Sequence, residues 1–368
     1  MRKDTGCMLE AMPLPARSTT LLFRTILLPI VLALAACATQ VPSPQSDPAA
    51  TSPPVIPVSA ADEASLRSLI SHQDRLYRVA GPLLVNSPAL CKGNARNLLG
   101  FTAKNKHSYS AELAHAAQML FGLNERLQVM GVLTGSGAAR VGLRRGDQLI
   151  EAEGQPLPQG SNAEKEAAAI LGPLVGTRSS IRLTVLRDGA NTVLNIPLTR
   201  ACAYSIELGN VDTVNAYDDG RRVMITRGMM NFAKSDEELA YVLAKEMAHN
   251  SLGHASRQNM SATIGDIIDN LVRIRPDTTI LAGTSGVRPM PQELDAAADT
   301  LSLYMLARAG YNVDRAPRFW ERLASQYPAS VLNGYTAIHP STAYRLSVME
   351  RIVADIKTKQ AGKKPLSP

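Results

Sequence analysis

The sequence predicts a multidomain α+β protein in which a β-rich domain precedes a domain built around a helix. Residues 181–187 and 192–196 alternate apolar and polar side chains on either side of an Asp188-Gly189 turn, which is typical of a β-hairpin. Residues 237–249 carry apolar side chains at three- and four-residue spacing, which indicates a helix. With 368 residues, of which 45% are hydrophobic, the chain is long enough for two or three domains.

The charge of the chain argues against a nucleic-acid binder. Its net charge is +7, and its lysines and arginines are scattered, with no basic surface interleaved with aromatic residues. The exception is a basic tail at residues 358–368, with Lys357 just before it. We expect this tail to be a solvated, frayed end.

The first 36 residues are expected to be an export signal rather than part of the fold. An apolar run at residues 26–34 follows two arginines and is too short to span a bilayer as a stable helix. The run ends in Leu34-Ala35-Ala36-Cys37, which resembles the bacterial lipobox. That resemblance implies cleavage before Cys37 and a lipid on its sulfur. Because alanine rather than aspartate follows, it also implies an outer-membrane lipoprotein that faces the periplasm of a Gram-negative bacterium. The alternative is an ordinary secretory signal with an incidental cysteine.

Residues 37–60 are rich in proline, serine and alanine, and we expect them to form an extended tether. Beyond this tether the cysteines become informative. If translation starts at Met8 or Met12, Cys7 is absent from the protein. With Cys37 lipidated, only Cys91 and Cys202 then remain. Two thiols in an oxidising compartment predict a disulfide between Cys91 and Cys202, and the alternative is two buried free thiols.

A helical segment at residues 61–96 precedes the β-rich domain, which we place at residues 97–200. Apolar side chains at helical spacing predict a helix that begins at residue 61 and ends near residue 79. Residues 131–150 resemble the central segment of a bacterial PDZ domain, with a strand, a Gly-Ser turn, a short helix, a Gly-Asp turn and another strand. The hairpin described above fits the end of such a domain, and residues 163–171 fit its helix.

The PDZ resemblance implies a groove that binds peptides. In PDZ domains a peptide adds a strand to a sheet edge, and backbone N–H groups of a nearby loop receive its terminal carboxylate. Leu99, Gly100 and Phe101 stand where that loop falls. The implied partners are unfolded or C-terminal peptide segments of envelope proteins, and the alternative is that this domain is a rigid spacer.

The helix expected over residues 237–249 carries the residues most informative for chemistry. Its apolar residues share one buried face, which makes it amphipathic, and Ser235 just before it can cap its start. Lys245, Glu246 and His249 almost spell His-Glu-x-x-His. In that motif two histidines one turn apart hold zinc, and the glutamate is the general base. Lys245 stands at the position of the first histidine.

Residues 201–357 place this helix in a longer context. Asn215-Ala216 precedes it, a run of carboxylates and alanines at residues 293–299 follows it, and His339-Pro340 lies near the end. In this order the segments resemble the gluzincin peptidases of the HtpX and CAAX-prenyl-protease type, in their periplasmic lipoprotein branch. The resemblance implies a mostly helical, zincin-like metallopeptidase domain after the PDZ domain.

Carried over position by position, the resemblance implies a site. The general base is Glu246, the second histidine ligand is His249, and the ligand carboxylate falls on Asp295. Asp299 falls on the aspartate that orients the ligands, and His339 falls on a histidine that lies near the reacting atoms in relatives. Asn215 and Ala216 fall on residues that line the substrate cleft.

Two of the three metal ligands depart from the family's pattern, so zinc is the implied cofactor but its occupancy is in question. A protonated lysine has no lone pair for a metal, and releasing its proton at pH 7 costs about 4 to 5 kcal/mol. Asp295 is one methylene shorter than glutamate. Glu293 lies roughly 200° away round the same helix as Asp295, and His254 lies roughly 140° past His249, so neither is placed to replace a ligand.

We therefore expect the ammonium of Lys245 to take the place that the metal holds in relatives. There it would offset the negative charge of nearby carboxylates. Its expected partners are Glu246, Asp295 or Asp299.

Two classes of function follow from these observations. The chain is either a zinc metalloendopeptidase that acts on unfolded or misfolded envelope proteins, or a pseudopeptidase that binds such peptides without cutting them. A purely structural lipoprotein is disfavoured by the two groove-bearing domains. The family favours the enzyme, whereas the ligand chemistry favours impaired catalysis, so the sequence alone leaves open whether the chain is an enzyme.

Overall fold

The described part of the computed structural model comprises residues 59–273, 275–281, 287–328 and 334–368. The expected signal at residues 1–36, Cys37 and the tether up to residue 58 lie outside it. Residues 57–368 form one compact unit. Among the described helices, none is long and apolar enough to cross a membrane.

Helix α1 (Ala60–Asn86) links the two parts of this unit. The side chain of Ser59 caps it by accepting the amide of Asp62 at 3.0 Å. The helix continues past the predicted end near residue 79 and through Pro82, because Leu83 and Leu84 extend its buried face. Its first half packs against α2 (Ala111–Phe121), and its second half belongs to the large core of the helical part.

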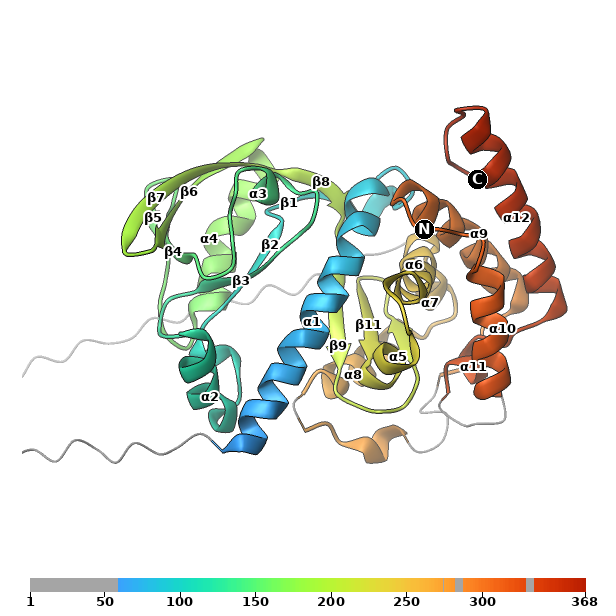
Figure 1. The fold of residues 1–368 in the computed structure, drawn as a ribbon, viewed down its shortest axis with the longest axis horizontal. Helices are drawn as coiled ribbons and strands as arrows, with labels where there is room; N and C mark the ends of the chain where they lie inside the picture. The colour runs from blue at the N-terminus through green and yellow to red at the C-terminus, as the bar shows by residue number, and fades with distance from the viewer. Residues whose placement is uncertain (1–58, 274, 282–286, 329–333) are drawn as a thin grey trace, which may run out of the picture. The chain divides into compact units, whose positions relative to one another are not determined.

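The first part of the unit is built on an antiparallel sheet in the order β2-β3-β4-β6-β7, with β5 paired to β4 (Figure 1). The predicted hairpin is present and is formed by β6 and β7, which pair along their whole length. Asp188 and Gly189 turn it with φ of 50° and 82°, the left-handed conformations that a two-residue hairpin turn requires. The strands are β2 (Phe101–Lys104), β3 (Gln128–Val132), β4 (Gln148–Ala152), β5 (Gln155–Pro156), β6 (Ser180–Arg187) and β7 (Ala190–Pro197).

Helix α4 (Ala163–Thr177) packs against this sheet and contacts β6. Its buried residues join inward-facing side chains of the sheet in one apolar core, which is separate from the core of the helical part. The short elements of this part are η1 (Lys92–Asn94), η2 (Lys106–Ser108) and α3 (Gly137–Arg140).

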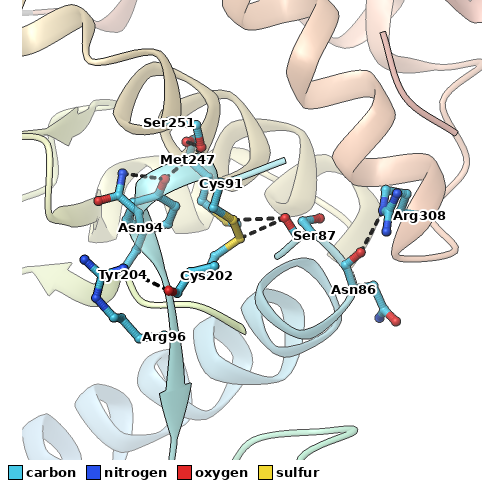
Figure 2. Close-up of a disulfide and its surroundings, with 11 residues drawn as sticks. Asn86, Ser87, Cys91, Asn94, Arg96, Cys202, Tyr204, Met247, Ser251 and Arg308 are labelled. Carbon is cyan, nitrogen blue, oxygen red and sulfur yellow. Dashed lines mark hydrogen bonds between the residues drawn. A yellow bond between two sulfur atoms is a disulfide. The ribbon is translucent and has the colours of Figure 1, made fainter. Parts of the chain in front are cut away.

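A disulfide joins the two ends of this first part. Strand β1 (Ala95–Leu98) pairs antiparallel with β8 (Thr199–Cys202), and just before β1 Cys91 is bonded to Cys202, with the two Cα atoms 5.7 Å apart. Figure 2 shows the bond beside Tyr204, whose hydroxyl lies 2.7 Å from Oγ of Ser251. Because Ser251 lies on α6, the bonded pair also lies next to the helix that carries the site. This is the pairing that the sequence predicted.

The second part is mostly helical, with a three-stranded sheet in the order β10-β11-β9. Strand β9 (Ser205–Gly209) pairs in parallel with β11 (Arg222–Thr226), and β10 (Ala216–Asp218) is the edge strand on the other side. The helices are α5 (Arg227–Phe232), α6 (Asp236–Leu252), α7 (His254–Arg257), α8 (Ser261–Leu271), η3 (Thr278–Leu281), α9 (Gln292–Arg308), α10 (Ala316–Gln326), α11 (Tyr335–Ile338) and α12 (Ala343–Ala361).

Helix α6 lies at the centre of this part and is buried on every side, which corrects the prediction of one buried face. The hydroxyl of Ser235 caps its start by accepting the amide of Glu238 at 3.2 Å, as predicted. Every residue from Leu239 to Ser251 is buried, because α1, α9, α10 and the β10–β11 hairpin all pack against the helix. Its polar residues therefore face protein rather than water, and they must find partners there.

The end of the chain is ordered against the core rather than frayed as expected. Helix α12 continues to Ala361, and Lys359 in its last turn lies 2.8 Å from the carboxylate of Asp355. The ammonium of Lys359 also donates to the carbonyl of Ser367 at 2.7 Å, and Leu366 packs against the apolar core. The last residues of the chain therefore pack back against α12 and the core, which their high lysine content did not indicate.

Candidate functional site

Four segments bring the residues of the site together. Helix α6 supplies three residues, α9 supplies two that are spaced four apart, the turn after α11 supplies one histidine, and α12 supplies Arg345. Helical spacing places the α6 and α9 residues on facing surfaces, because these two helices pack against each other. All are at most 4% exposed: Lys245, Glu246, His249, Asp295, Asp299, His339 and Arg345.

One oxygen, Oδ1 of Asp295, is the centre of the cluster. It lies 2.7 Å from Nδ1 of His339, 3.1 Å from Nε2 of His249 and 3.2 Å from Nζ of Lys245. The second oxygen of the same carboxylate lies 3.4 Å from Nη1 of Arg345. Burial by itself raises the pKa of Asp295, but the charge of Lys245, followed by that of His339, holds it well below its usual range. Asp295 is therefore an ionised carboxylate surrounded by nitrogen atoms.

Asp299 is the second anion of the cluster and shares both cations with Asp295. Its Oδ1 lies 3.0 Å from Nζ of Lys245, and its Oδ2 accepts a hydrogen bond of 2.7 Å from Nε of Arg345. Burial alone would lower the pKa of Arg345, but Asp299 and Asp295 raise it, so this guanidinium stays charged. Two buried cations and two buried anions balance each other.

Lys245 therefore pairs with two of the three partners that the sequence named. No ion pair joins it to Glu246 within the described part of the chain. Its Nζ also lies 5.0 Å from the centroid of the Trp320 ring, close enough for a cation–π contact. The two carboxylate contacts are short, but neither is aligned as a hydrogen bond, so attraction of charge is the main interaction.

Glu246 is the only predicted catalytic carboxylate outside this charge network. Its Oε1 accepts a hydrogen bond of 2.7 Å from the hydroxyl of Tyr335, which begins α11. Its Oε2 is buried and has no hydrogen-bond partner. Burial raises the pKa of Glu246 above its usual value, although His249, Tyr335 and Lys245 all oppose the shift.

Three buried histidines line the same region. The ring of His249 lies 4.8 Å from that of His339 and 4.9 Å from that of His254. Nδ1 of His254 is 2.9 Å from Nδ1 of His249, so one of the two nitrogens carries a proton and donates it. Burial lowers the pKa of all three, to about 3 for His254, whereas Asp295 opposes the shift at His249 and His339.

The contact between His254 and His249 corrects the angle argument made from the sequence. Helix α6 ends at Leu252, and Gly253 adopts the left-handed conformation with φ of 69°. The chain reverses there, so the rotation of 100° per residue no longer applies to His254. His254 contacts the ring of His249 but is not among the candidate metal ligands, which are His249, Asp295 and His339.

A groove of about 480 Å³ lies beside the predicted peptide-binding loop. Leu99, Gly100 and Phe101 line it, and they lead into β2, which is an edge strand of the first sheet. Residues of α4, α1 and β9 also line it. The residues that line the groove are all uncharged. The geometry suits an extended apolar segment placed along β2.

A comparison with protein families finds a similarity that covers most of the second part of the chain. Residues 183–353 match the model of peptidase family M48. This is a family of metallopeptidases, so residues 183–353 are similar to an M48 metallopeptidase domain. The match begins within β6 and extends into α12, and it includes every residue of the cluster described above.

Curated relatives are similar over the same part. The chain is 27% identical over 172 residues to mitochondrial metalloendopeptidase OMA1 of Arabidopsis thaliana, covering 44% of this chain and 35% of that protein. It is 26% identical over 135 residues to the beta-barrel assembly-enhancing protease of Yersinia pestis, covering 32% of this chain and 28% of that protein. The chain thus spans about a third of the length of these relatives.

Part of the chain is matched by a solved structure, the PDZ domain of HtrA3 bound to a phage-derived ligand. The TM-score is 0.22 with 19% identity, and the match covers 29% of this chain and 88% of that chain. A score this low does not establish the fold, so the PDZ assignment remains a proposal.

Because the matched family is one of metallopeptidases, a metal is the cofactor to consider at this cluster. His249, Asp295 and His339 each offer a ligand atom, and the three atoms lie within 4.8 Å of one another. Nε2 of His249 and Oδ2 of Asp295 also lack well-aligned hydrogen bonds. However, the nitrogens converge on Asp295 Oδ1 itself, and the Lys245 ammonium lies 3.2 Å from that oxygen. A divalent cation bound there would lie against a positive charge, so the arrangement does not fit zinc unless Lys245 moves or loses its proton.

The residues expected to line the cleft of the M48-type domain are buried in this structure. Asn215 is 0% and Ala216 is 1% exposed, immediately before and within the edge strand β10. The Asn215 amide donates to the hydroxyl of Tyr217 at 2.8 Å. Glu293 is exposed, as its position on α9 predicted.

Three residues of the site were missed by reasoning from the sequence. Arg345 balances Asp295 and Asp299, and Tyr335 donates to Glu246. Asp218 ends strand β10, where burial and then the charge of Glu246 raise its pKa well above its usual range. Arg345 follows the His339-Pro340 pair by five residues, and that proximity is the only local signal for it. Nothing in the local sequence of Tyr335 or Asp218 points to α6, because their contacts are made across long separations.

Proposed function

We propose that this protein is an envelope lipoprotein of the metalloendopeptidase type, which binds unfolded or misfolded envelope proteins and whose zinc catalysis is impaired. The observation that carries the proposal is the buried ammonium of Lys245, which lies 3.2 Å and 3.0 Å from Asp295 and Asp299. The relatives named metalloendopeptidases and the M48 match support the reaction class.

The impairment has an electrostatic cause. A catalytic zinc site needs three protein ligands with free lone pairs and an open position for water. Here the side chain at the first ligand position is a cation, and the carboxylate that would bind zinc is already neutralised by Lys245. Metal binding would require breaking a buried ion pair and removing a proton, so we expect weak affinity.

Metal content and proteolysis of the unmodified protein test this proposal. We expect elemental analysis to find zinc well below one ion per chain. Cleavage of an unfolded substrate should be slow or absent, and unchanged by a chelator or by Glu246→Gln. Stoichiometric zinc, together with proteolysis abolished by both treatments, would refute the impairment.

The second candidate function is a fully active zinc endopeptidase. It predicts stoichiometric zinc and proteolysis that a chelator and Glu246→Gln both abolish. The cluster of His249, Asp295 and His339 favours it, because it supplies three ligand atoms without Lys245. In this case His339 replaces the missing histidine. A His339→Ala variant would then lose its zinc, whereas under our proposal there is little zinc to lose.

The groove beside residues 99–101 gives the peptide-binding part of the proposal. Within the described part of the chain, β2 is the last strand at one edge of its sheet and lines the groove, so a bound segment can pair with it as an added strand. The apolar walls favour apolar side chains, and backbone N–H groups of the loop are the available partners for a terminal carboxylate. We propose that this part is a PDZ domain that recruits C-terminal segments of envelope proteins. If the M48-type site is inactive, this groove makes the chain a non-catalytic quality-control factor.

A peptide titration checks the groove. An apolar peptide with a free C-terminus should bind at least about tenfold more tightly than its C-terminal amide, because a charged acceptor strengthens hydrogen bonds from N–H groups. Val175→Asp in the groove wall should weaken binding, whereas Val193→Asp on β7, which is 61% exposed, should not. Equal affinity for the acid and amide forms would reject this site.

The proposed location depends on Cys37, which lies outside the described residues. Its basis is the lipobox-like sequence that follows a short apolar run. We expect the wild-type protein to fractionate with outer membranes and the Cys37→Ser variant to be found in the soluble periplasmic fraction. A Cys37→Ser variant that still fractionates with outer membranes would contradict the lipid anchor.

A further inference from the structure

The groove beside residues 99–101 is lined by side chains that belong to two separate cores. Leu171 and Val175 on α4 line it, and both pack in the core of the first sheet. Tyr77 on α1 and Ile206 on β9 also line it, and both pack in the core of the helical part. One groove of about 480 Å³ is therefore in contact with both parts of the unit.

Successive side chains of β2 point to these two cores in turn. Phe101 and Ala103 pack against the core that contains the buried residues of α4. Thr102 lies between them and points the other way. A Cβ at Gly131, its partner on β3, would lie 3.2 Å from Thr102 Oγ1 and 3.8 Å from Cδ2 of Tyr77. Because side chains alternate between the faces of a sheet, one face of β2 is turned to α4 and the other to α1.

A segment that pairs with the edge of β2 continues this alternation. Its side chains point in turn to the α4 side and to the side formed by α1 and β9, so both sets meet protein. On a sheet edge with a wall on one face alone, every second side chain of an added strand would lie in water. Those positions would then accept almost any residue.

The side formed by α1 and β9, which we call the second wall, is held in place by the helical part. It consists of Tyr77, Tyr204 and Ile206. Ile206 is 5% exposed and pairs with Val223 on the neighbouring strand β11. The hydroxyl of Tyr204 lies 2.7 Å from Oγ of Ser251 on α6. The second wall is therefore already ordered before a segment binds, and binding loses little entropy there.

We propose that the groove selects consecutive residues of the bound segment, one alternate set through α4 and the other through the second wall, with Thr102 as the residue of β2 on that side. This inference rests on the proposed peptide binding. It adds the class of segment that is bound: an unfolded C-terminal stretch in which every one of the last four residues, and not each second one, is uncharged.

The charge of the lining is the reason for this preference. Among the described residues that line the groove, none is charged. An ionised side chain that enters from either face loses water and finds no counter-charge, which disfavours binding. The terminal carboxylate differs, because backbone N–H groups of the loop at residues 99–101 are available to it.

A peptide scan on the full chain tests the second wall without any protein variant. The parent is an apolar peptide with a free C-terminus, and each of its last four residues is replaced by aspartate in turn. Each replacement should weaken binding by at least about tenfold. The same aspartate placed at the N-terminus behind a Gly-Ser linker should leave the affinity unchanged. Weakening confined to two alternate positions would overturn the proposal.

Two lysine variants then assign peptide positions to the two walls. Thr102→Lys places an ammonium on the face turned to α1, and Val175→Lys places one on the α4 side. Thr102→Lys should tighten binding of the aspartate peptides about tenfold at one alternate pair of positions, and Val175→Lys at the other pair. Val193→Lys on β7, where the side chain is 61% exposed, should tighten neither. Circular dichroism verifies that each variant is folded.

The outcomes separate this inference from the peptide binding on which it rests. If both folded lysine variants act on the same pair of positions, or Thr102→Lys acts on none, the second wall does not contact the segment. If a variant does not fold, the scan on the wild-type protein still decides. A parent peptide that does not bind at all would overturn both proposals. A parent that binds and tolerates aspartate at alternate positions would overturn the second wall alone.

Discussion

The double variant Lys245→His/Asp295→Glu is expected to bind near-stoichiometric zinc, where the wild type binds little. The substitution removes the ammonium that lies 3.2 Å from Asp295 and supplies an imidazole one turn before His249. Glutamate adds the methylene that the carboxylate on α9 lacks. Because structural zinc sites in peptides release about 10 to 16 kcal/mol, even a partly strained site should fill. Bound zinc is measured by elemental analysis after dialysis.

Three controls make the result specific. Lys357→His alters an exposed lysine that pairs with Asp314 at 3.0 Å, and it should bind no more zinc than the wild type. Asp295→Glu alone should not restore binding, because Lys245 remains. Zinc should also raise the unfolding temperature of the double variant, because it binds the folded state. A double variant that folds and stays free of zinc would show that ligand loss is not the main defect.

Lys245→Ala is expected to destabilise the fold by about 3 to 5 kcal/mol, the cost of removing one partner from a buried ion pair. Asp295 and Asp299 are 0% and 1% exposed, and they would keep only Arg345 as a counter-charge. The alanine also leaves a cavity beside Trp320, whose ring lies 5.0 Å from Nζ. Denaturant unfolding at neutral pH measures the loss.

The matched control is Lys357→Ala, which breaks an ion pair of similar length at the surface. Lys357 and Asp314 are 57% and 45% exposed, so this change should cost less than about 1 kcal/mol. Asp299→Asn added to Lys245→Ala should recover part of the loss, because one uncompensated anion disappears. If Lys245→Ala costs no more than Lys357→Ala, the lysine is not a structural replacement for the metal.

The sequence determined the features that depend on short-range geometry. The Asp188-Gly189 turn fixed the β6–β7 hairpin, because few residue pairs adopt two successive left-handed conformations. Ser235 and the helical period placed α6, and the spacing of Lys245, Glu246 and His249 put them on one helix. The departure from the zinc motif was visible there as well, since it depends only on residue type.

Tertiary structure alone decided which charges meet. Tyr335 reaches Glu246 on α6 from α11, and Arg345 reaches Asp299 on α9 from α12, each across tens of residues of sequence. The burial of α6 on all sides and the reversal at Gly253 also depended on neighbouring elements. A local pattern shows which face a side chain takes. It does not show what packs on that face, and for a buried charge the partner decides whether it binds a metal, a proton or another side chain.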